Sequence, residues 1–228
     1  MPTAQPHIRS FHPRRGRVTS SQAASIERLW PAFGIEVGPR TLDLAEVFGD
    51  DRPVVVEIGF GTGEATAAMA SADPGTNLLA VDVHTPGFGR LLAAIGAEGL
   101  DHVRVVSGDA VELFRDMLEA GSLAGIRIFF PDPWPKARHH KRRLVGPEFV
   151  ALAISRLASG GTFHLATDWP PYVDQMRRVL DAEPLLTKAF DRQEARPAHR
   201  PAQRPSTRFE RAGRAKGHPV TDLLYVRS

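Results

Sequence analysis

Short apolar runs alternate along this chain with segments that favour helices. Runs rich in β-branched residues predict strands at residues 54–60, 77–84, 103–106, 125–130 and 162–167, and residues 220–226 resemble a last strand. Helix-forming stretches lie between them at residues 64–72, 91–95, 110–118, 149–157 and 172–180. Four or five strand–helix units in series predict an α/β fold, with a mostly parallel sheet and helices on both faces.

Polar and conformationally special residues gather where the predicted strands end. Residues 131–135 read Pro-Asp-Pro-Trp-Pro, and three prolines so close together exclude both a helix and a central strand. Parallel sheets bind ligands at the carboxyl ends of their strands. The sequence therefore predicts a functional loop here, with Asp132 on it.

Length and composition narrow the class of protein. The chain has 228 residues, which fits one domain at residues 31–228 behind a basic, flexible extension at residues 1–30. It has no apolar run long enough to span a membrane and no apolar leader segment, which predicts a cytoplasmic protein. The sequence contains no cysteine, so thiol catalysis and disulfides are excluded, and we expect no metal site.

Positive charge is concentrated in three segments. Residues 1–30 hold five arginines and one glutamate, residues 136–143 hold five cations and no acid, and residues 192–228 hold nine cations and three acids. The remainder of the chain is net acidic. This separation favours a polyanionic partner that binds the basic segments.

The first predicted strand ends in a glycine-rich turn. Glycines at positions 59, 61 and 63 allow a ligand to approach the backbone closely. The dinucleotide fingerprint would need a glycine at position 64, where this chain has Glu64, and a carboxylate would repel a pyrophosphate. S-adenosylmethionine (SAM) has no phosphate and fits better. Asp82 is placed to accept hydrogen bonds from the two ribose hydroxyls, and Asp109 is placed to accept one from the adenine amino group.

The combined motifs resemble the bacterial tRNA (guanine-N7)-methyltransferases. The resemblance runs from about residue 27 to the end of the chain. It rests on Val56 to Gly63, on Val83 to Gly87, on the segment PDPWPKARHHKRRLV from Pro131, on Ala166 to Trp169, and on Arg204 to Glu210. The glycine turn occurs in many methyltransferases, whereas the PDPWPK segment combined with the late Thr-Arg-Phe-Glu segment is specific.

The resemblance implies a Rossmann-like fold, with a mostly parallel, twisted sheet of about seven strands of which the last is antiparallel. It also implies a SAM-dependent enzyme that methylates N7 of guanosine 46 in the tRNA variable loop. The positions that match SAM-binding residues are Glu57, Asp82, Asp109 and Asp132, of which Asp132 is also the catalytic candidate. Those that match substrate-binding residues are Lys136, Asp168, Thr207, Arg208, Phe209 and Glu210. The chain departs from the family at Asp82, Arg208 and Ala212, where a glutamate, a lysine and an arginine are usual.

The residues suggest a mechanism on their own. Guanine N7 has a free lone pair, so methyl transfer needs in-line placement and no general base. Asp132 is placed to stabilise the positive charge that develops on the purine, and Trp134 to stack on a base. Cations from the basic segment, namely Arg138, Lys141, Arg142 and Arg143, would bind phosphates beside the reaction. Glu210 is expected to accept hydrogen bonds from the guanine N1 and N2 donors.

Three other functions remain open at this level. A nicotinamide-dependent oxidoreductase explains the glycine turn, although Glu64 disfavours it. A non-catalytic tRNA-binding protein explains the basic segments and leaves the acids at the strand ends without a purpose. A methyltransferase that acts on another acceptor is the nearest competitor.

Overall fold

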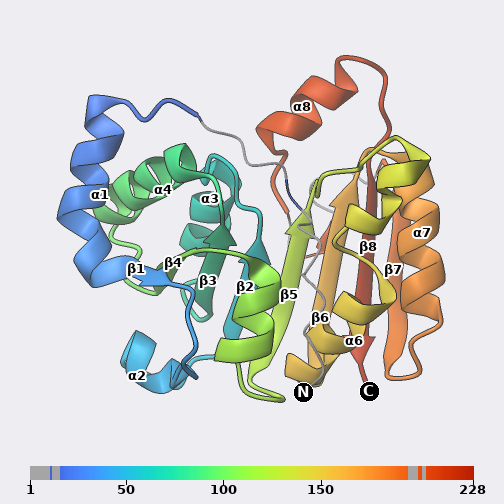
Figure 1. The fold of residues 1–228 in the computed structure, drawn as a ribbon, viewed down its shortest axis with the longest axis horizontal. Coiled ribbons are helices and arrows are strands. Elements are labelled where there is room, and N and C mark those ends of the chain that lie inside the picture. The colour runs from blue at the N-terminus through green and yellow to red at the C-terminus, as the bar shows by residue number, and fades with distance from the viewer. Residues whose placement is uncertain (1–10, 12–15, 195–199, 202–203) are drawn as a thin grey trace.

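The computed structural model describes residue 11 and residues 16–194, 200–201 and 204–228, and it contains one eight-stranded sheet. The strands follow the order β1-β4-β3-β2-β5-β6-β8-β7 (Figure 1). Their bounds are β1 Gly34–Glu36, β2 Val54–Ile58, β3 Asn77–Asp82, β4 Val103–Ser107, β5 Leu123–Phe129, β6 Leu157–Thr167, β7 Leu186–Gln193 and β8 Thr221–Arg227. All neighbouring strands from β1 to β6 are parallel, and β8 is antiparallel to both β6 and β7.

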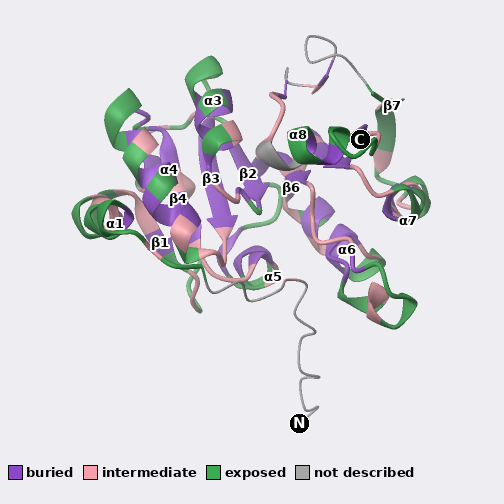
Figure 2. Cartoon of the chain, turned by 90° about the horizontal axis from the view of Figure 1, so that it is seen from above, coloured by how far each residue is buried: buried purple, intermediate pink, exposed green. Residues whose placement is uncertain are grey.

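Helices cover both faces of the sheet, as the alternating pattern predicted. On one face lie α1 Ser20–Phe33, α3 Glu64–Ala72 and α4 Thr85–Glu98. On the other lie α2 Leu44–Phe48, the short helices α5 Ala110–Glu112 and η1 Leu113–Met117, α6 Pro147–Arg156 and α7 Pro170–Asp181. Figure 2 looks down on the strand ends and separates α3 from α5 and α6. The central strand β2 is buried along its whole length, because both of its faces pack against helices.

The edges of the sheet and the start of the domain differ from the sequence-based expectation. The sheet has eight strands rather than about seven, since the short strand β1 adds an edge beside β4. Strand β7 was not predicted because its sequence, LTKAFDRQ, lacks a continuous apolar run. Its side chains are half-buried or exposed in the structure. Residues 20–30, expected in the flexible extension, form most of α1, which starts at a capping box between Thr19 and Gln22. The ordered domain therefore begins before residue 31.

The reversed direction of β8 determines what lies at the carboxyl edge of the sheet. Because β8 starts at this edge, the chain must pass over it before entering the strand. The helix α8, Arg208–Arg214, lies there above the strand ends (Figure 1). No helix among the described residues is long and apolar enough to cross a membrane.

Candidate active site

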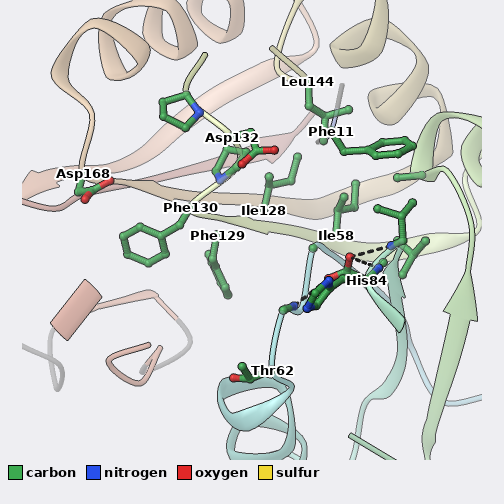
Figure 3. A pocket seen from close by; sticks show the side chains of 18 of the residues that line it. Phe11, Ile58, Thr62, His84, Ile128, Phe129, Phe130, Asp132, Leu144 and Asp168 are labelled. Atoms are coloured by element: carbon green, nitrogen blue, oxygen red, sulfur yellow. Dashed lines mark hydrogen bonds between the residues drawn. The ribbon is translucent and has the colours of Figure 1, made fainter. Parts of the chain in front are cut away.

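A cavity of about 460 Å³ opens at the carboxyl edge of the parallel strands. Its wall comes from the loops that follow β2, β3, β4, β5 and β6, and from α8 and the turn after it. Figure 3 shows Asp168 on one side, His84 on the other and Asp132 between them. The cavity thus lies at the carboxyl ends of the strands, where parallel sheets bind ligands.

The glycine turn after β2 forms one end of the cavity. Gly59 and Gly61 line it, with φ angles of 80° and 58° in the left-handed region that favours glycine. A Cβ atom at Gly59 would meet no protein atom within 4 Å, so the backbone leaves open space for a ligand there. Gly63 is different, because it does not line the cavity and an added Cβ would lie 2.8 Å from Cβ of Leu91 in α4. Gly63 serves helix packing.

Asp82 ties the glycine turn to the end of β3. Its Oδ2 accepts a hydrogen bond from the Gly61 N–H at 2.8 Å, and its Oδ1 accepts from the N–H groups of Val83 and His84 at 2.7 and 3.0 Å. Burial nevertheless raises the pKa of Asp82 above its ordinary value, and the three backbone donors oppose that rise. The carboxylate lines the cavity and holds three backbone amides in place around it.

Two further acids support this end in different ways. Asp109 lines the cavity and caps α5 by accepting from the Val111 N–H at 2.9 Å. Glu57 lies below the cavity wall inside β2, where its Oε1 accepts from the Thr66 hydroxyl and its Oε2 has no hydrogen-bond partner among the described residues. Burial raises the pKa of Glu57 to about 7, although the nearby Arg127 opposes this. An unpaired buried carboxylate oxygen behind the glycine turn fits a site that receives a cationic ligand.

The proline loop places Asp132 in the cavity. Phe130 and Trp134 flank it with φ angles of 53° and 43°, an unusual conformation for bulky residues. The Phe130 N–H donates to the Ala166 carbonyl in β6 at 2.7 Å, which ties the start of the loop to the sheet. Asp132 points into the cavity toward Leu144 (Figure 3), and both residues belong to its wall.

Two residues near the proline loop are too buried for the RNA contacts expected from the sequence. Trp134 is only 4% exposed, and its ring packs against His139 and under the guanidinium of Arg142. Arg143 is 6% exposed, and its guanidinium donates to the Pro133 carbonyl at 2.8 Å and to Gln175 Oε1 at 2.8 Å. The phosphate-binding role expected for Arg143 is therefore wrong in this structure, because Arg143 fixes the loop to α7.

The other cations of that segment are exposed. Lys136 precedes the short helix η2, Ala137–Arg142, which carries Arg138, Lys141 and Arg142 on the surface. None of these four side chains lines the cavity. Their position beside the proline loop leaves them available to a polyanion, which stays a prediction.

Glu210 is fully buried, contrary to the expectation that it would read a base. Its carboxylate pairs with Arg200 and, at 2.8 Å, with Nη1 of Arg204, while Arg214 reaches it from the outside at 3.1 Å. The expected guanine contact is wrong here, because arginines occupy the carboxylate and it does not line the cavity. Glu210 instead secures α8 to the body of the protein.

Arg204 is the centre of this buried ionic cluster, defined here as His164, Arg200, Arg204, Glu210 and Asp222. Its side chain has no exposed area, and it donates to both oxygens of Asp222 at 2.7 and 2.9 Å. Its guanidinium also lies 5.3 Å and 5.5 Å from the ring centres of Phe129 and Phe130. The cluster thus joins β8, α8 and the start of the proline loop.

The remaining substrate candidates divide into three groups. Asp168 lines the cavity after β6. Thr207 caps α8 by accepting from the Glu210 N–H at 3.1 Å, and it lies outside the cavity wall. Arg208 and Phe209 begin α8, and their side chains lie outside the part of the chain that the structure describes.

Several wall residues were not among the site residues predicted from the sequence. They include Phe11, Leu144, Ala212, Gly213, Lys216 and His218. Phe11 and Leu144 come from segments without a strand-end position, and the last four reach the cavity only because the buried ionic cluster brings α8 over the sheet. His84 was within reach of sequence reasoning, since it follows Asp82 in the same turn.

Comparison with known proteins agrees with this geometry. Residues 51–223 match a family described as "Putative methyltransferase". Solved structures with the same fold include the 16S rRNA methyltransferase KamB, with a TM-score of 0.59 and 16% identity over 82% of this chain and 95% of that one. TrmN from Thermus thermophilus has a TM-score of 0.56 and 18% identity, over 91% of this chain and 48% of that one. Fold and site together define a Rossmann-like methyltransferase.

Closer relatives specify the family. The chain is 57% identical to the tRNA (guanine-N(7)-)-methyltransferase of Streptomyces coelicolor, over 96% of this chain and 81% of the relative. It is 49% identical to the protein of that name from Bordetella pertussis, over 97% of this chain and 86% of the relative. The chain belongs to the tRNA (guanine-N(7)-)-methyltransferase family.

Proposed function

We propose that this chain transfers the methyl group of SAM to N7 of guanosine 46 in the tRNA variable loop. The observation that best supports this proposal is the composition of the cavity wall. The glycine turn and the acids at the strand ends form one end of the cavity, and Asp132 and Asp168 belong to the other. The curated relatives that share this sequence are named for methylation of tRNA guanine at N7.

The residues at the glycine end suit SAM. Gly59 and Gly61 leave the backbone open to the ligand, Asp82 faces the cavity where ribose hydroxyls would be accepted, and Asp109 is suitable for an adenine amino group. Glu57 is buried behind the turn, and a ligand with an amino group and a sulfonium would favour its ionised form. When bound, SAM supplies an electrophilic methyl group.

Asp132 and Asp168 lie away from the glycine turn, at what we call the acceptor end of the cavity, and would act on the guanine that accepts the methyl group. The N7 lone pair needs no deprotonation, so the contribution of the chain is placement and charge stabilisation. Asp132 is fixed by a rigid loop, and its negative charge would stabilise the purine cation that forms. The exposed cations Arg138, Lys141 and Arg142 would bind phosphates next to this point.

The proposal is tested with an unmodified tRNA transcript that carries guanosine at nucleotide 46. Incubation with the protein and SAM should yield N7-methylguanosine at that nucleotide, and a transcript with adenosine in its place should yield none. Asp132→Ala should lower the rate about 100-fold or more with little loss of tRNA affinity, and Asp132→Asn separates charge from shape. Methylation at another nucleotide, or none with SAM bound, would overturn the assignment.

A further inference from the structure

Asp168 has a close neighbour that no sequence motif indicated. Nδ1 of His218 lies 3.5 Å from Oδ2 of Asp168, and both side chains belong to the cavity wall. Asp168 comes from the loop after β6, and His218 from the turn after α8, so the contact joins two segments that are 50 residues apart in the chain. Both side chains keep part of their surface exposed, at 28% for Asp168 and 46% for His218.

The local backbone explains why His218 faces Asp168. Gly217 adopts a left-handed conformation with φ of 76°, which ends the helical turn. The His218 N–H then donates to the Gly213 carbonyl at 3.1 Å, so the chain folds back against α8. Since Glu210 anchors α8 through the buried ionic cluster, the position of His218 is set from within the protein.

Gly213 lies close to the same carboxylate and leaves the space that it occupies. A Cβ atom at this position would lie 2.7 Å from Oδ2 of Asp168, closer than real side chains approach. The glycine is buried, and its φ does not fall in the left-handed region. The need for glycine here therefore comes from the close approach of Asp168 and not from the backbone conformation.

A carboxylate held in this way matches one edge of guanine. Guanine presents two adjacent donors, N1–H and the N2 amino group, and the two oxygens of one carboxylate can accept both. Adenine has an acceptor at N1 and no N2 amino group, so a fixed carboxylate rejects it. Glu210 cannot serve this purpose because arginines occupy it, whereas Asp168 lines the same cavity as Asp132.

We propose that His218 is a positioning residue which, together with Gly213, fixes the Asp168 carboxylate against the N1 and N2 donors of the target guanine. This inference rests on the proposed function. His218 acts through Asp168 by keeping Nδ1 3.5 Å from Oδ2 of the carboxylate, and Gly213 provides the space in which the carboxylate lies.

Three substitutions of His218 test this role. Asn places an amide nitrogen close to the position of Nδ1, whereas Gln extends it toward the position of Nε2 and Ala removes the donor. We expect His218→Ala and His218→Gln to lower kcat for tRNA about tenfold, and His218→Asn to restore it to within about threefold of wild type. The dissociation constants of tRNA and of S-adenosylhomocysteine should change less than about twofold, because phosphate and cofactor contacts stay intact.

A target nucleotide without the N2 amino group makes the test specific. Inosine in place of the target guanosine keeps N7 and N1–H and lacks the amino group. Wild type should lose rate on the inosine transcript, and His218→Ala should lose much less on changing from guanosine to inosine, because its carboxylate is no longer fixed for both donors. Equal losses in both proteins, or failure of Asn to restore the rate, would overturn the proposal.

Gly213→Ala provides an independent arm. The added methyl group must displace Asp168, so this variant should reproduce the kinetic loss of His218→Ala. Gly96→Ala in α4 is the matched control, since its Cβ would meet only the flexible ends of side chains, Leu29 at 3.0 Å and Arg28 at 3.9 Å. Wild-type rates for a folded Gly213→Ala protein would contradict the proposal. Absence of methylation by the wild-type protein would instead reject the proposed function.

Discussion

The two ends of the cavity are built by different means. The glycine end uses backbone amides and acids that follow β2, β3 and β4, and one carboxylate, Asp82, binds three N–H groups within residues 61–84. The acceptor end depends on the buried ionic cluster, whose members extend from His164 to Asp222. The first end is local and specified by short motifs, whereas the second requires distant side chains to meet. Damage to the two ends should therefore have different consequences.

The largest effect is expected for Arg204→Ala. Removal of this fully buried guanidinium leaves Asp222 and Glu210 short of a partner, which should lower the free energy of unfolding by about 3–5 kcal/mol. Urea denaturation measures the loss, and Arg211→Ala, which removes an exposed contact to Glu64, should cost less than about 1 kcal/mol. If Arg204→Ala costs no more than Arg211→Ala, the cluster does not hold the acceptor end.

Glu57→Gln should remove a pH dependence that arises at the glycine end. Burial raises the pKa of Glu57 from 4.5 to about 7, so between these values the folded chain holds a proton that the unfolded chain has lost. Stability should therefore decline as pH rises through this window, by about 3 kcal/mol. Urea denaturation of wild type and Glu57→Gln at about pH 4.5 and about pH 8 measures the difference, and parallel curves would contradict it.

The acceptor end should respond to pH in the opposite direction. Burial would raise the pKa of Asp222, but hydrogen bonds from His164 and Arg204 outweigh it and lower that pKa from 3.8 to about 2. The resulting stability is present above pH 3.8 and is lost as pH falls toward 2. Acid denaturation of wild type should thus include a component from Asp222 that the Glu57→Gln variant retains.

Asp82→Ala should weaken cofactor binding and leave the acceptor end intact. The substitution removes the charged acceptor of three backbone N–H groups, and it removes the carboxylate that would bind the ribose of the ligand. We expect the affinity for S-adenosylhomocysteine to fall about 10- to 100-fold in calorimetry. Binding of tRNA, which we propose depends on the exposed cations of residues 136–142, should change little. An unchanged cofactor affinity would show that Asp82 serves only the turn.

The smallest effect separates two adjacent arginines. Arg142→Ala should reduce the slope of log affinity for tRNA against log salt by about one unit, because an exposed phosphate contact is lost. Arg143→Ala should leave the slope unchanged and lower stability, because its guanidinium bonds to Pro133 and Gln175. Equal changes of slope in both variants would show that Arg143 reaches the RNA after all.

The sequence predicted the fold, and it pointed to several residues that line the cavity at the glycine end, but to fewer at the acceptor end. Strands β2 to β6 are recognisable in the sequence as apolar runs. Asp82 and Asp109 were predicted as site residues because they follow the ends of two of these strands. Glu210 was misjudged because a charged residue in a basic segment suggests an exposed contact. The arginines that bury it lie six and ten residues away and meet it only through tertiary packing. His218 was not predicted for the same reason, since it meets Asp168 only in the folded chain.

The direction of β8 also has a consequence for synthesis on the ribosome. Strand β8 inserts between β6 and β7, which precede it in the chain. A nascent chain from which β8 has not yet emerged leaves the edge of β6 open, and Asp222 is missing from the partners of Arg204. Asp82 makes its backbone hydrogen bonds within residues 61–84, whereas the buried ionic cluster needs Asp222 from β8. We therefore expect the acceptor end to form only after the last strand has joined the sheet.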